Sequence, residues 1–134
     1  GPEKLKIIHT TDFAPFVSTT FATGITQTTA TSGGNVVADG GSPVTVRGVC
    51  WSATPYPTTD DNKTDDSSGT GLFISSLTGL LPNTNYYVRA YAINSQGTAY
   101  GIQETFTVLA TLVATLTTTP ATNITTTGAT LGGN

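Results

Sequence analysis

The acidic segment DDNKTDD is the one concentration of charged side chains in this sequence. Every second residue in it carries an oxygen donor, at Asp60, Asn62, Thr64 and Asp66, and calcium prefers such hard oxygen ligands. Against a calcium loop, Asp65 stands where the EF-hand pattern requires glycine, and no glutamate follows at the spacing of its bidentate ligand. A calcium site and a solvated surface loop both stay open, and the pattern favours the solvated loop. No other cofactor is expected.

Residue types that usually carry catalysis are few and isolated. The only histidine is His9, and no serine or cysteine lies in a nucleophile-elbow context. The run Gly69-Thr70-Gly71 lacks the strand–turn–helix setting of a phosphate-binding loop, and Glu104 forms no evident carboxylate pair of the glycosidase kind. The sequence therefore predicts no catalytic residues and a protein that is not an enzyme.

The single cysteine, Cys50, cannot form an internal disulfide and lies in an apolar run beside Trp51. No histidine or basic cluster stands near it in the sequence to lower its pKa, so a small buried hydrophobe is favoured over a reactive thiol. A secreted protein without a disulfide fits a bacterial surface better than an animal extracellular module.

The charge balance excludes two classes of partner. Charged residues make up 10% of the 134 residues and the net charge is −3, with only five scattered basic residues. Such a chain has no basic surface for nucleic acid or anionic lipid, and no apolar stretch is long enough to insert into a membrane.

The segment LLPNTNYYVRAYA, residues 80–92, reads as a strand that would position the remaining candidates. Alternation puts its residues on opposite faces: Tyr86, Val88, Ala90 and Ala92 on one, and Asn85, Tyr87, Arg89 and Tyr91 on the other. Aromatic residues and an arginine together are typical of binding surfaces, so Tyr87, Arg89 and Tyr91 form a candidate binding surface. Plain cross-strand packing, with Arg89 stacked on a tyrosine, is the alternative and the one we favour.

The same period-two patterns and intervening turn residues predict six longer strands and no helix. We expect strands over 16–20, 28–39, 44–52, 72–77, 80–93 and 98–108, with a long polar loop over 53–71. The core should contain Tyr86, Val88, Ala90, Leu77, Leu80, Phe73 and Trp51. Gly48, within the third strand, should let a bulky neighbour approach the backbone closely.

Several of these pieces resemble a known family. The run Leu-x-Pro-x-Thr-x-Tyr-x-Val-x-Ala over 80–90 is similar to the F strand of fibronectin type III domains, and RGVCWS (47–52) and GTAYG (97–101) resemble tandem repeats of bacterial surface proteins. The resemblance implies an all-β, Ig-like/fibronectin-III-like antiparallel sandwich of about seven strands. It also implies that Tyr86 is the corner tyrosine, with its hydroxyl bonded to backbone in or near Leu80–Asn83.

The end of the chain repeats its beginning. Residues 116–134 match residues 17–35 at 12 of 19 positions, at an offset of 99 residues, which is the length of one sandwich. We therefore expect a tag remnant and N-terminal arm over 1–14, a sandwich repeat over 15–108, and a linker with the first two strands of a truncated repeat over 109–134. Because two strands alone are marginal, residues 109–134 should dock by strand addition or exchange on their own or a neighbouring molecule.

These observations predict a non-catalytic spacer or stalk repeat of a secreted or cell-surface bacterial adhesin-type protein, whose partners are the neighbouring repeats of the same polypeptide. One alternative is a glycan- or protein-binding module that uses the 53–71 loop and the outward tyrosines. Another is an accessory domain of a secreted polysaccharide-degrading enzyme.

Overall fold

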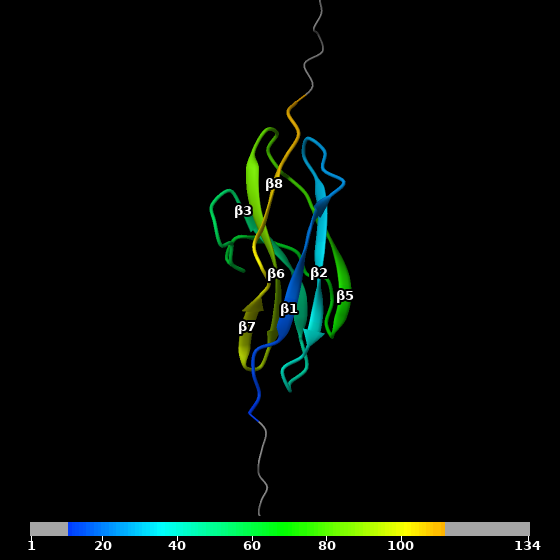
Figure 1. The fold of residues 1–134 in the computed structure, drawn as a ribbon, viewed down its shortest axis with the longest axis vertical. Helices are drawn as coiled ribbons and strands as arrows, with labels where there is room; N and C mark the ends of the chain where they lie inside the picture. Colours follow the sequence, from blue (N-terminus) through cyan, green and yellow to red (C-terminus); the bar gives the residue numbers. More distant parts are fainter. Residues whose placement is uncertain (1–10, 112–134) are drawn as a thin grey trace, which may run out of the picture.

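A computed structural model describes residues 11–111, and these form two antiparallel β-sheets packed face to face, with no helical residue in this range (Figure 1). The first sheet has the order β1-β2-β5, with β1 (Phe16–Thr23), β2 (Ala30–Ala38) and β5 (Gly71–Leu77). The second has the order β4-β3-β6-β7, with β4 (Asn62–Lys63), β3 (Val46–Ser52), β6 (Asn85–Asn94) and β7 (Gly97–Tyr100), and β8 (Glu104–Thr107) also pairs with β6. The expected all-β sandwich is confirmed.

The core lies between the two sheets and follows from the alternation of side chains. In β5, Phe73 and Leu77 are buried while Leu72 and Ile74 are 78% and 76% exposed on the outer face. Each of the side chains expected in the core is at most 7% exposed: Tyr86, Val88, Ala90, Leu77, Leu80, Phe73 and Trp51. Burial of one large apolar side chain contributes about 1.5–3 kcal/mol, so this layer is the main source of stability.

A pair of glycines in β2 lets neighbouring backbone and the facing sheet come close. A Cβ on Gly34 would lie 2.8 Å from the Ala90 Cβ in the other sheet and 3.0 Å from the Phe73 ring. Gly33 has a φ of +146°, and a Cβ there would collide with the carbonyl oxygen of Phe73, in the adjacent strand β5 of the same sheet. Gly34 therefore permits the close approach of the two sheets, and Gly33 permits the close approach of β5.

The last strand differs from its expectation. Instead of one strand over 98–108, the chain forms β7 and β8 with a break at residues 101–103. Gly101 donates from its amide to the Ala90 oxygen (2.8 Å), and a Cβ on Gly101 would collide with Thr19 of β1. At this break the Ala90 amide donates to the Thr19 Oγ1 (2.9 Å). The hydroxyl of β1 thus replaces a ladder partner and ties the two sheets together.

The described chain enters the sandwich at one end and leaves it at the other (Figure 1). We call these ends the N-terminal pole, made by residues 12–15 and the turns at 39–42 and 94–97, and the C-terminal pole, made by the turns at 26–29 and 78–84 and residues 108–111. The predicted second copy and its docking lie outside the described residues from position 112 onward, as do His9 and most of the N-terminal arm.

Candidate functional site

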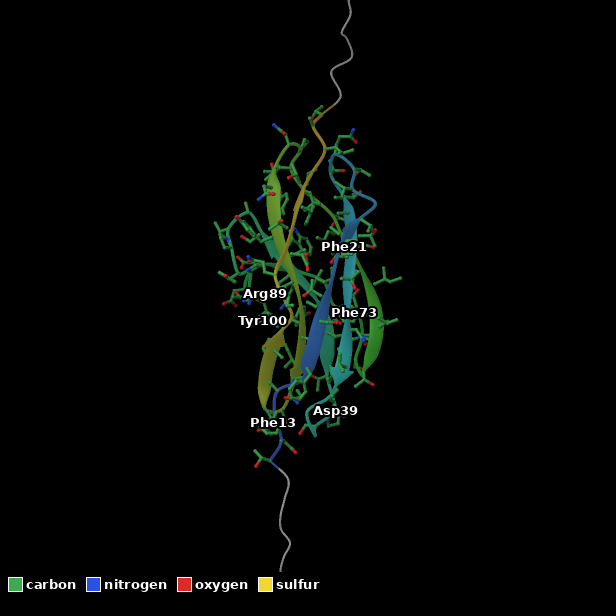
Figure 2. The ribbon with its side chains drawn as sticks, in the orientation of Figure 1. Phe13, Phe21, Asp39, Phe73, Arg89 and Tyr100 are labelled. Carbon is green, nitrogen blue, oxygen red and sulfur yellow. The ribbon has the colours of Figure 1, made fainter. Side chains whose placement is uncertain are left out.

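Arg89 lies at the centre of a small cluster on the outer face of the second sheet, with Tyr100 beside it (Figure 2). Its guanidinium carbon is 3.9 Å from the centroid of the Tyr100 ring and 5.8 Å from that of Tyr56. Its Nε donates a 2.7 Å hydrogen bond to the carbonyl oxygen of Pro57. The arginine is held by two aromatic rings and one backbone oxygen, an arrangement typical of cation–π packing.

Sheet pairing and a folded-back loop together build this cluster. Tyr100 pairs with Tyr91 across β6 and β7, which places its ring next to Arg89, two residues earlier in β6. The loop after β3 then lies over this face, where the Thr59 amide donates to the Tyr100 hydroxyl (3.2 Å). Its tip is fixed by a hydrogen bond from the Tyr56 amide to the Gln103 side chain. Tyr56, with a left-handed φ of 57°, is left 67% exposed.

The same loop shows that one expected site residue is wrong. Tyr91 points away from the core, as alternation requires, but it is only 1% exposed, and its hydroxyl donates to the carbonyl oxygen of Thr64 (2.5 Å). Residues 53–66 cover it, so Tyr91 is not part of a binding surface. Gly48 is its cross-strand partner, and a Cβ on Gly48 would collide with the Thr64 oxygen. The outward row is reduced to half-buried Tyr87 and Arg89.

Cys50 lies beneath the same loop and is fully buried. Its single S–H proton lies within reach of two carbonyl oxygens, and it can be donated to that of Pro57 (Sγ to oxygen 3.4 Å) or to that of Arg89 (3.6 Å). Burial, only partly offset by the nearby positive charge of Arg89, raises the pKa of the Cys50 thiol to about 11. A protonated and inaccessible thiol is a poor nucleophile, so Cys50 is a buried packing residue. Burial also raises the pKa of Tyr91 to about 12, with Asp65 and Asp66 adding to the effect.

The four candidate calcium ligands have different roles in the structure. The Asp66 carboxylate accepts hydrogen bonds from the hydroxyls of Thr64 (2.6 Å) and Ser75 (2.5 Å), which ties the loop to β5. Thr64 Oγ1 in turn accepts from the Val49 amide (3.0 Å), whereas Asp60 and Asn62 are exposed. Within residues 11–111, no group of three or more histidine, cysteine, aspartate or glutamate side chains is placed to hold a metal ion. Thr64 and Asp66 anchor the loop.

No protein-family model matches the chain, and no curated protein matches it. Among solved structures, the sensor domain of the anti-sigma factor RsgI4 in Pseudobacteroides cellulosolvens is similar at 20% identity with a TM-score of 0.53, over 72% of this chain and 96% of that one. The third fibronectin III domain of the human KIAA0343 protein is similar at 13% identity with a TM-score of 0.50, over 87% of this chain and 100% of that one. The fold is a fibronectin III-like sandwich. At these identities the likeness concerns the fold alone.

Within this fibronectin III-like sandwich, Tyr86 lies near the start of β6, at the corner that this strand forms with the turn at 80–84. Its ring is 7% exposed and stacks on Phe106 at a centroid distance of 5.7 Å. Its hydroxyl accepts a 2.9 Å hydrogen bond from the amide of Leu81, inside the segment where the resemblance places the partner. The turn at 80–84 is thereby fixed to the core.

Across the part of the chain that the structure describes, the geometry provides no cleft for a substrate. The Arg89 cluster is a flat surface with one protruding ring, that of Tyr56. Such a surface can contact a partner through stacking and hydrogen bonding, but it offers no nucleophile paired with a base. Stacking of Arg89 on a tyrosine was part of the cross-strand packing expected from the sequence. The contribution of Tyr56 was missed, because Tyr56 lies in the 53–71 loop, far from Arg89 along the chain.

Proposed function

We propose that this unit is a non-catalytic structural repeat of a secreted or cell-surface bacterial protein of the adhesin type, where it spaces and presents a distal domain. The fibronectin III-like fold is consistent with a structural or a binding module. The role as a structural repeat is supported by the identity of the residues that recur 99 positions later in the sequence.

Several of the recurring residues make contacts that the sandwich needs, and this observation carries the proposal. Thr19, whose hydroxyl closes the gap beside Ala90, recurs as Thr118. The glycine pair of β2 recurs as Gly132-Gly133, and the buried Ala30 recurs as Ala129. In a second unit folded in the same way, these positions would serve the same contacts.

The positions that differ also follow the structure. Phe21 is 63% exposed and is replaced by Pro120, and Gly24, with a φ of +57°, is replaced by Asn123. Asparagine is among the side chains that best tolerate this left-handed conformation. The buried Ser32 becomes Leu131, so the second unit needs a different residue opposite that position.

A segment graft tests whether residues 116–134 encode the same two strands. They would replace residues 17–35 in this chain, with serine kept at the position of Ser32 to avoid overpacking. We expect a cooperative unfolding transition within about 2 kcal/mol of the original. A matched graft with alanine at the position of Gly34 should fold less stably, because the Cβ meets Ala90. A first graft that fails to fold would contradict the proposal.

A binding module is the second candidate, and the exposed ring of Tyr56 favours it. The ring stands on a rigid base of Arg89 and Tyr100, which lowers the entropy lost when a glycan or protein stacks on it. A glycan array and a protein pull-down with the native chain, Tyr56→Ser and the control Ile74→Ser would test this. Binding lost only in Tyr56→Ser would support the candidate, and no binding by the native chain would leave the spacer.

A further inference from the structure

The two poles of the sandwich each hold the backbone by specific hydrogen bonds. At the N-terminal pole, the Phe13 amide donates to the Gly40 oxygen (2.8 Å), and the Asn94 side chain donates to the Phe13 oxygen (2.7 Å). The Ser42 hydroxyl donates to the Asp12 carboxylate (2.8 Å). Figure 2 shows Phe13 and Asp39 together at this end. The chain is therefore fixed to the sandwich before β1 begins.

At the C-terminal pole the chain stays fixed beyond the end of β8. Val108 donates from its amide to Thr84 (2.9 Å), and Leu109 donates to Thr26 (3.1 Å). The Leu109 oxygen accepts from the Asn83 amide (3.1 Å). Leu109 is consequently part of the folded unit, and the free chain can only begin at Ala110.

The 99-residue offset determines how much free chain could separate two units. It aligns Asp12 with Thr111 and Phe13 with Leu112. If the following unit fixes its chain as this one does, only Ala110 and Thr111 lie between the last fixed residue of one unit and the equivalent of Phe13 in the next. Three steps of extended chain span about 11 Å at most, close to the ~10 Å that separates two packed protein layers.

From this spacing we infer that successive repeats stack pole to pole in direct contact, with no flexible linker. The inference rests on the proposed repeat function and identifies its partner as the N-terminal pole of the following copy. Leu81 and Leu109, 64% and 50% exposed, supply the apolar contact from the C-terminal pole. The equivalent of the 57%-exposed Phe13 in the next copy is Leu112, so the sequence keeps an apolar residue at that position.

The C-terminal pole carries no charge that opposes this contact. The turns at 26–29 and 78–84 and residues 108–111 contain no charged side chain, so no ion loses its hydration when the pole is covered. Asp12, at the N-terminal pole, is replaced by Thr111 at the junction. The junction therefore has one charge fewer than the N-terminal pole of this unit.

A two-unit chain tests the inference directly. Residues 11–111, which form a complete sandwich, would be followed at once by residues 13–111, so that the natural 99-residue spacing is kept. With one unit isotopically labelled at a time, residual dipolar couplings would report the alignment of each unit. We expect the same alignment tensor for both units, and a several-fold smaller tensor for one of them when six glycine and serine residues are inserted after Ala110.

Side-chain variants distinguish the effect of contact between the two poles from the effect of a short linker. Leu81→Ser with Leu109→Ser should make the two tensors diverge, whereas the control Leu72→Ser with Ile74→Ser, on the outer face of β5, should not. Independent tensors in the two-unit chain without substitutions, or equal tensors in the variant with both Leu81→Ser and Leu109→Ser, would overturn the inference. Two folded but independently oriented units would leave the spacer proposal standing, while only the graft described above can remove that proposal.

Discussion

Removal of the Tyr86 hydroxyl is the sharpest test of how the sandwich corner is held. In Tyr86→Phe the ring keeps its place against Phe106, so the only direct loss is the hydrogen bond from the Leu81 amide. A buried donor left without a partner costs about 1–3 kcal/mol. The Leu81 residue is 64% exposed, so water reaches part of this amide and we expect a loss of about 1.5 kcal/mol, in the lower half of that range.

The adjacent tyrosine provides a matched control. Tyr87 lies half-buried on the opposite face of β6, and its hydroxyl makes no hydrogen bond within residues 11–111, so Tyr87→Phe should change the free energy of unfolding by less than about 0.5 kcal/mol. Urea unfolding followed by the fluorescence of the buried Trp51 would measure both variants. With a denaturant slope of about 1.5 kcal/mol/M, the midpoint of Tyr86→Phe should fall by about 1 M. Equal losses in the two variants, or no loss at Tyr86, would refute the reasoning.

Three further outcomes follow from contacts between the sheets and beneath the loop. Gly34→Ala should lower the free energy of unfolding by more than about 2 kcal/mol in the same urea assay, because the new Cβ would lie 2.8 Å from the Ala90 Cβ. A loss below about 0.5 kcal/mol would contradict this expectation. Thr19→Val should lose about 1–2 kcal/mol and speed hydrogen exchange of the Ala90 amide, whereas Thr20→Val should leave that amide protected. For Cys50, the unfolded thiol ionises above pH 9.0 while the folded thiol keeps its proton to about pH 11, so stability is constant below pH 9 and falls across this window. The full loss from this thiol is about 3 kcal/mol. Cys50→Ala should flatten the pH profile between pH 9 and 10, above which the raised pKa of Tyr91 adds its own pH dependence; an unchanged profile from pH 9 to 10 would show that another group titrates.

Local patterns in the sequence were sufficient for most of the strands and for the inner face of β6. Alternation in β5 already separates Phe73 and Leu77 from Ile74, since a strand with one face on the core buries every second side chain. The corner tyrosine was expected from the resemblance of residues 80–90 to the F strand of fibronectin type III domains. The sandwich fold itself is confirmed by these strands and by its solved neighbours.

The outer face of the second sheet could not be predicted in the same way. Whether Tyr91 is solvent-exposed depends on where the loop over 53–66 lies, and that depends on distant contacts such as the bond from Tyr91 to Thr64. The break between β7 and β8 likewise depends on Thr19 approaching from the other sheet. Gly48 was the one local signal, because a glycine inside a strand indicates that backbone approaches closely there.

The position of the two chain ends has a mechanical consequence. The strand β1 starts near one end of the sandwich and β8 runs toward the other (Figure 1), so tension transmitted along a polymer of such units would pull along both strands. Their ladder bonds to β2 and β6 lie perpendicular to that pull. The hydrogen bonds would therefore be loaded together in shear and would not open one after another. The hydrogen bond from the Ala90 amide to Thr19 would resist separation of the two sheets.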